Sequence, residues 1–120
     1  MPVEVSIHQI PESPGVRVVA IDETGPGGAH HSYQILDPGG ETEFASIEFQ
    51  RGGVADNGYN GVTNEALLAI VWHRLKAFQD GRFPCPENAE AMDYVRGAIE
   101  TLGARTALRV KRGVEGKEVA

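Results

Sequence analysis

The sequence contains little cysteine, few aromatic residues and no long hydrophobic run. One of its 120 residues is a cysteine, Cys85, so no disulfide can form within the chain. No stretch approaches the roughly 20 consecutive apolar residues that a membrane-spanning helix needs. The opening residues show neither the basic nor the apolar part of a secretory signal. We therefore expect a cytoplasmic protein that does not interact with a membrane.

An excess of basic residues is also lacking. The formal net charge is −6, which argues against a nucleic-acid polymer as partner, because proteins that bind one normally present a basic surface. The charge is unevenly distributed: residues 1–65 contain two basic and ten acidic residues, whereas residues 66–120 contain nine basic and seven acidic residues. A small anionic ligand is therefore expected to bind the C-terminal part of the chain.

Motifs for catalysis or metal binding are absent as well. His30 and His31 are adjacent but have no companion ligands at a useful spacing. Cys85 and His73 come from different segments without a third group to orient them. No phosphate-binding loop or dinucleotide fingerprint occurs. We therefore expect no catalytic residue, no metal and no cofactor, and hence a protein that is not an enzyme.

The first half of the chain has the pattern of short strands. Val3, Val5 and Ile7 alternate with polar residues, which is typical of a half-buried strand. The turn-forming run at residues 37–40 and the short spacings favour an antiparallel meander, and the glycine-rich run at residues 25–28 predicts a flexible loop. Strands are predicted over residues 3–7, 16–21, 32–36 and 45–49.

The second half predicts a helical hairpin. Thr63 is a suitable N-cap for a first helix that ends at Asp80-Gly81, with the glycine in a left-handed conformation. Pro86 suits the first turn of a second helix that runs to about Arg112. The prediction is thus an α+β fold in a single domain over residues 1–120. Its expected parts are a strand-rich part (1–58), a helical hairpin (59–116) and a tail (117–120).

Apolar patterning within the hairpin indicates where its helices pack. The unbroken apolar run from Ala66 to Trp72 needs burial on more than one face, by the sheet, another hairpin or another subunit. Gly97 and Gly103 each weaken the second helix by roughly 1 kcal/mol relative to alanine. A stripe with heptad-like spacing follows that helix through Asn88, Met92, Val95, Ile99, Leu102, Thr106 and Arg109.

Residues 60–116 contain a series of short runs that together form a specific pattern. The pattern opens with the run 60–71, continues through Arg74-Leu75, Phe78-Gln79, Gly81, Phe83, Cys85 and Glu87-Asn88-Ala89, and closes with Arg105-Thr106, Arg109 and residues 112–116. It resembles the hairpin shared by phage anti-Thoeris and anti-CBASS sponges. The acidic strand region resembles the small sheet of the anti-Thoeris members. The resemblance implies a protein that sequesters glycocyclic ADP-ribose, an alarm signal made by TIR-domain enzymes, in the cytosol of the infected bacterium.

The same resemblance implies four ligand-binding residues. Phe78 corresponds to the aromatic residue that stacks on adenine, Asn88 to the hairpin-loop asparagine, and Arg105 and Arg109 to two arginines. Guanidinium groups suit the ligand's pyrophosphate, because they donate paired hydrogen bonds to phosphate oxygens. Each residue also has an ordinary structural alternative: core packing for Phe78, capping of a backbone N–H for Asn88, and interaction with the helix C-terminus for the arginines.

The chain departs from the family pattern at two places near these residues. Pro86 stands where relatives often carry a basic residue, and Gly103-Ala104 stand where bulkier residues are common. These differences affect the outline of the pocket and the ligand preference. Some relatives also bind cyclic oligonucleotides at separate sites formed by higher oligomers. A sponge for cyclic di- or trinucleotides and a protein–protein interaction module therefore remain alternatives.

The spacing of the four residues predicts a shared site. Asn88 and Arg105 are 17 positions apart, and at about 1.5 Å per residue they are roughly 25 Å apart on a continuous helix. One compact cyclic nucleotide cannot span that distance. The spacing therefore predicts a homodimer, and the resemblance implies that such dimers can assemble further into a hexamer. One chain supplies Phe78 and Asn88 to each pocket, and its partner supplies the arginines.

Overall fold

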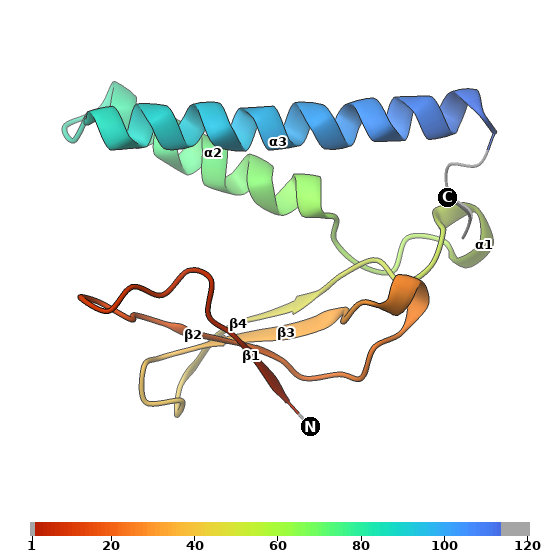
Figure 1. Ribbon diagram of the computed structural model, residues 1–120, viewed down its shortest axis with the longest axis horizontal. Coiled ribbons are helices and arrows are strands. Elements are labelled where there is room, and N and C mark those ends of the chain that lie inside the picture. Colours follow the sequence, from red (N-terminus) through yellow and green to blue (C-terminus); the bar gives the residue numbers. More distant parts are fainter. Residues whose placement is uncertain (1, 114–120) are drawn as a thin grey trace. The chain divides into compact units, whose positions relative to one another are not determined.

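The computed structural model describes residues 2–113, which form two compact units. One unit, up to Val62, contains the sheet, and the other begins at Thr63 and contains the long helices (Figure 1). The predicted α+β class, with an N-terminal sheet followed by a helical hairpin, is confirmed. The predicted tail at 117–120 and the last expected hairpin residues, 114–116, lie outside the described residues.

The sheet is an antiparallel meander of four strands in the order β1-β2-β3-β4. Its β-branched residues favour extended backbone, and the pairing places Val18 opposite Ile35 in the middle of the sheet. The predicted end of the first strand is wrong, because that strand stops before Ile7, whose side chain is 95% exposed. A turn closed by the hydrogen bond from the Gln9 N–H to the Ser6 carbonyl (2.9 Å) ends that strand. The strands are β1 (Val3–Val5), β2 (Arg17–Ala20), β3 (Ser32–Leu36) and β4 (Glu43–Glu48).

The turns between the strands follow the sequence signals. The Gly40 N–H donates to the Asp37 carbonyl (2.9 Å), and Gly40 has a φ of 76° that favours glycine. Backbone N–H groups of Thr42 and Glu41 donate to the Asp37 carboxylate, and they hold the pKa of Asp37 below its ordinary value. The glycine-rich run expected as a loop contains one short 3-10 turn, η1 (Pro26–Gly28).

The segment after β4 folds back onto the end of that strand. It contains the short helix α1 (Val54–Asn57), which the sequence patterns did not predict. The Gln50 carboxamide donates to the Gly58 carbonyl (2.7 Å) and accepts from the Asn60 N–H (3.0 Å). Phe49 and Val62 then form a parallel bridge. These contacts hold the chain in place up to the residue before Thr63.

The two long helices begin where the sequence predicts. In α2 (Asn64–Asp80), the Thr63 hydroxyl accepts from the Ala66 N–H at 3.1 Å. The second helix, α3 (Pro86–Lys111), is continuous and has its proline in the first turn. The predicted left-handed Gly81 is wrong: its φ is −104°, and its N–H bonds the Phe78 carbonyl. Neither helix is long and apolar enough to cross a membrane, nor is any other helix within residues 2–113.

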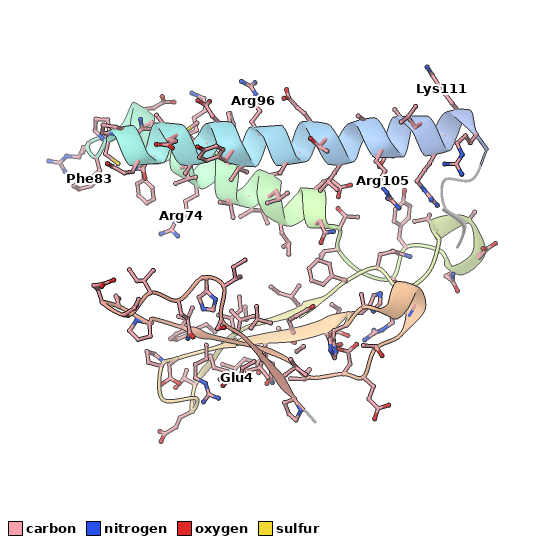
Figure 2. The ribbon with its side chains drawn as sticks, viewed as in Figure 1. Glu4, Arg74, Phe83, Arg96, Arg105 and Lys111 are labelled. Atoms are coloured by element: carbon pink, nitrogen blue, oxygen red, sulfur yellow. The ribbon has the colours of Figure 1, made fainter. Side chains whose placement is uncertain are left out.

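α2 and α3 pack against each other (Figure 2). Six of the seven stripe residues on α3 are half-buried, and the seventh, Arg109, is buried. The Arg96 guanidinium of α3 lies 5.8 Å from the ring centroid of Trp72 on α2, which adds a cation–π contact between the helices. One face of the apolar run on α2 remains uncovered, since Ile70 and Val71 are 65% and 47% exposed.

Candidate functional site

The four predicted site residues lie toward opposite ends of α3. Phe78, in the last turn of α2, and Asn88, in the first turn of α3, share the end of the hairpin that contains its turn. Arg105 lies toward the other end of α3, away from Phe83 in the turn (Figure 2). Because α3 is continuous through Gly97 and Gly103, about 25 Å of helix separates Asn88 from Arg105. One chain therefore places Phe78 and Asn88 at the same end of the hairpin but does not bring the arginines to that end.

Phe78 is half-buried and has a cation beside its ring. The guanidinium carbon of Arg74, one helical turn earlier, lies 5.2 Å from the Phe78 ring centroid. This distance is within the range of a cation–π interaction. The aromatic side chain is thus neither a fully buried core residue nor a freely exposed one, and a charged group lies over one face of its ring.

Asn88 does not act as the cap of its helix. Cys85 is the N-cap of α3, and its thiol sulfur accepts from the Asn88 backbone N–H at 3.4 Å. The Cys85 N–H in turn donates to the side-chain oxygen of Gln79 at 2.7 Å. Within residues 2–113, no group hydrogen-bonds the half-buried Asn88 carboxamide. Its amide oxygen and nitrogen thus have the capacity to bind another molecule.

The two arginines differ in their surroundings. Arg105 is exposed, whereas Arg109, one turn later on the same face, is only 7% exposed. Arginine is rarely so buried, because the guanidinium group remains charged and loses hydration. Arg109 also lies in the last turn of α3, so interaction with the helix C-terminus stays an alternative for it.

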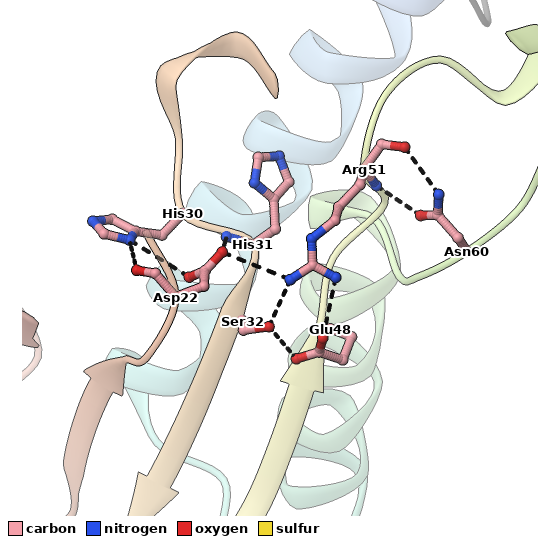
Figure 3. A network of polar contacts seen from close by, with 7 residues as sticks. All are labelled: Asp22, His30, His31, Ser32, Glu48, Arg51 and Asn60. Carbon is pink, nitrogen blue, oxygen red and sulfur yellow. Dashed lines mark hydrogen bonds and ion pairs between the residues drawn. The ribbon is translucent and has the colours of Figure 1, made fainter. Parts of the chain in front are cut away.

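A polar cluster separate from the four predicted site residues lies within the sheet unit and is centred on Arg51 (Figure 3). The Arg51 guanidinium donates to the Ser32 hydroxyl (2.8 Å) and forms ion pairs with Glu48 (3.2 Å) and Asp22 (3.7 Å). The Ser32 hydroxyl donates to Glu48. The Arg51 backbone exchanges two hydrogen bonds with the Asn60 side chain (2.7 and 2.9 Å). The cluster thus ties β3, β4 and the segment after β4 together.

The carboxylates of this cluster are held in their charged forms. Burial raises the pKa of Asp22, but hydrogen bonds from the His31 and Ser32 backbone and the nearby His30 ring outweigh it, so the net pKa is lowered. The Ser32 hydroxyl and the Arg51 guanidinium lower the pKa of Glu48. His30 contacts Asp22 through its Nδ1 (3.5 Å), and Ser32 bonds to Glu48 and Arg51, not to an imidazole. The cluster therefore has the chemistry of a structural tie.

Sequence reasoning missed two features of these sites. It gave Cys85 no structural role, although a residue directly before a proline at the first helical position is in the N-cap position. It also assigned no role to Gln79 or Arg51, whose partners lie in other segments. Only the sequence position of Cys85 carried a usable signal.

The comparisons with known proteins agree with this architecture. Residues 41–107 match the family model described as "Acb2/Tad1, hairpin domain", and the chain therefore belongs to this family. It is 44% identical over 92 residues to a protein of Bacillus phage SBSphiJ7 named "Thoeris anti-defense 1". The aligned part is 77% of this chain and 63% of the phage protein, so the chain spans less than two thirds of that relative. The resemblance to the anti-Thoeris sponge family is confirmed.

Proposed function

We propose that this protein is a phage anti-defence sponge. It binds glycocyclic ADP-ribose made by TIR-domain enzymes, holds the ligand without degrading it and so blocks Thoeris immunity in the host cytosol. The family match and the relative named Thoeris anti-defense 1 support this function. The mechanism is mass action, since a signal held in the pocket cannot activate the downstream effector.

The observation that carries the proposal is the distribution of the site residues along one continuous helix. About 25 Å of α3 separates the Phe78–Asn88 end from the arginines. In a two-fold dimer with antiparallel hairpins, the arginines of one chain meet Phe78 and Asn88 of the other at each of two pockets. Phe78 stacks on the adenine, the free Asn88 carboxamide hydrogen-bonds the ligand, and Arg105 and Arg109 bind the pyrophosphate.

Exposed apolar side chains on the hairpin support the dimer. Ile70 and Val71 on α2 and Tyr94 on α3 are largely exposed in the single chain. Within residues 2–113, the apolar residues that are buried are the small Val19 and Ala20. A second copy that covers the apolar face would supply burial that one chain lacks. Further assembly of dimers would create the separate sites at which cyclic oligonucleotides bind in some relatives.

Ligand release distinguishes this proposal from its alternatives. Purified protein is incubated with glycocyclic ADP-ribose, freed of unbound ligand, and heated, and the released molecule is identified by mass spectrometry. We expect intact ligand at about one molecule per chain, by the symmetry of the dimer. The variant with Arg105→Ala and Arg109→Ala is the matched control and should release almost none. A hydrolysed product formed with turnover would contradict the sponge mechanism, and retention of cyclic di- or trinucleotides alone would favour the alternative.

A further inference from the structure

We propose that Gln79 and Cys85 are positioning residues that fix Asn88 beside Phe78 before the ligand arrives. The inference rests on the proposed function, because it takes Asn88 and Phe78 as ligand contacts. It assigns a role to two side chains that the binding scheme does not use. Neither needs to touch the ligand to affect how tightly it binds.

Gln79 joins the end of α2 to the start of α3. It follows Phe78 directly, so the stacking residue and the anchor leave the same helical turn. Its side-chain oxygen accepts the Cys85 N–H at 2.7 Å across the turn between the helices. That N–H precedes the first turn of α3 and would otherwise need another partner. The bond therefore sets the position of the α3 N-terminus relative to Phe78.

Cys85 transmits this position to Asn88. Its sulfur accepts the Asn88 N–H at 3.4 Å, and its extended backbone (φ −154°, ψ 155°) places the side chain as an N-cap. Pro86 has no N–H, so the cap acts on the part of the turn that carries Asn88. The Asn88 carboxamide has no hydrogen-bond partner among the described residues, so its place depends on this backbone anchor.

The expected consequence is a loss of preorganisation. A side chain that must be ordered when the ligand binds lowers the affinity, and for one such group the expected loss is about three- to tenfold. Because the two hydrogen bonds act in series, removing both should weaken binding little more than removing either one. Phe78 and the arginines remain in place, so the weakened variants should still bind measurably.

A matched pair of variants at Cys85 tests the inference most directly. Cys85→Ser keeps a side-chain acceptor at the N-cap, and serine is a preferred residue there, whereas Cys85→Ala removes it. We expect calorimetric titration with glycocyclic ADP-ribose to give wild-type affinity for Cys85→Ser and about three- to tenfold weaker binding for Cys85→Ala. Gln79→Met should match Cys85→Ala, and His73→Met, at an exposed position of α2, should bind as the wild type does.

Two further measurements separate positioning from general stability. Gln79→Met should weaken ligand binding little further when it is added to Asn88→Ala, because residue 88 then has no carboxamide that Gln79 could position. Hydrogen exchange in the free protein should show faster exchange of the Cys85 and Asn88 amides in Gln79→Met, with the melting temperature reported alongside.

The outcomes distinguish the two proposals. If the unmodified protein does not bind glycocyclic ADP-ribose, the proposed function fails and this inference fails with it. If the unmodified protein binds but Cys85→Ala and Cys85→Ser bind equally well, the function stands and the positioning role is wrong. A loss in Gln79→Met that persists undiminished beside Asn88→Ala also contradicts positioning.

Discussion

A pocket shared between two chains makes a quantitative prediction about mixed dimers. One variant carries Phe78→Ala and Asn88→Ala, and the other carries Arg105→Ala and Arg109→Ala. Each homodimer of a single variant should lose both pockets, because every pocket lacks one of its halves. In the heterodimer, one pocket combines all four substitutions and the other combines four intact residues.

The expected capacity follows from the symmetry and the helix length. The roughly 25 Å between Asn88 and Arg105 prevents a pocket within one chain. Random exchange of equal amounts of the two variants gives heterodimers as half of all dimers, and each heterodimer has one of two pockets intact. The mixture should therefore bind about one quarter of the ligand that the unmodified protein binds.

Native mass spectrometry resolves the prediction for each species. The two variants are given different masses, exchanged, and titrated with glycocyclic ADP-ribose. The verified heterodimer should carry one ligand, and each homodimer should carry none. If heterodimers bind nothing while the unmodified dimer binds two, the assignment of Phe78 and Asn88 to one chain and the arginines to the other is wrong.

Three further predictions concern stability. A Cβ on Gly61 would lie 2.6 Å from the Glu48 carbonyl oxygen and would overlap the Phe49 backbone, so Gly61→Ala should lower the free energy of unfolding by about 1–3 kcal/mol, measured with denaturant; an unchanged value would contradict the close approach. Gly97 has open space around its Cβ position, so Gly97→Ala should instead raise the melting temperature through a gain of up to about 1 kcal/mol; a lower melting temperature would show that the space is occupied. The folded-state pKa values of Asp22 and Glu48 are lowered, so their contribution to the free energy of unfolding is present at neutral pH. This contribution is lost as the pH falls below about 4.5, the ordinary pKa of Glu48. In an acid titration, Glu48→Gln should therefore show a smaller loss of stability than the unmodified protein.

The helices were predictable because their signals are local. Thr63 and Pro86 lie within one turn of the groups they affect, and both helix starts agree with the structure to within a residue. The stripe on α3 was predictable for the same reason, since helical spacing alone selects one face. The apolar face that stays exposed was not predictable from helical spacing. α2 packs against α3, yet Ile70 and Val71 on α2 remain exposed.

The sheet end and the segment after it show where local reasoning stops. The alternation from Val3 continues to Ile7 in the sequence, yet the strand ends because a backbone hydrogen bond within residues 6–9 competes with the ladder. The short helix α1 has no apolar period to reveal it. The segment around it depends on contacts between residues about ten positions apart, such as Gln50 with Asn60.

Asn88 does not have the capping role that its residue type suggests. From the sequence, capping of a backbone N–H was the structural alternative for Asn88, since asparagine is among the preferred capping residues. Cysteine offers only a weak acceptor, so its residue type does not indicate a cap, although its position before Pro86 does. The cap is nevertheless the thiol, because Gln79 fixes the Cys85 backbone from the neighbouring helix. Asn88, which is the better capping residue by type, therefore does not cap the helix. Its half-buried carboxamide lies at the same end of the hairpin as Phe78. The arrangement uses the weaker cap and so leaves the Asn88 carboxamide available for the proposed binding role.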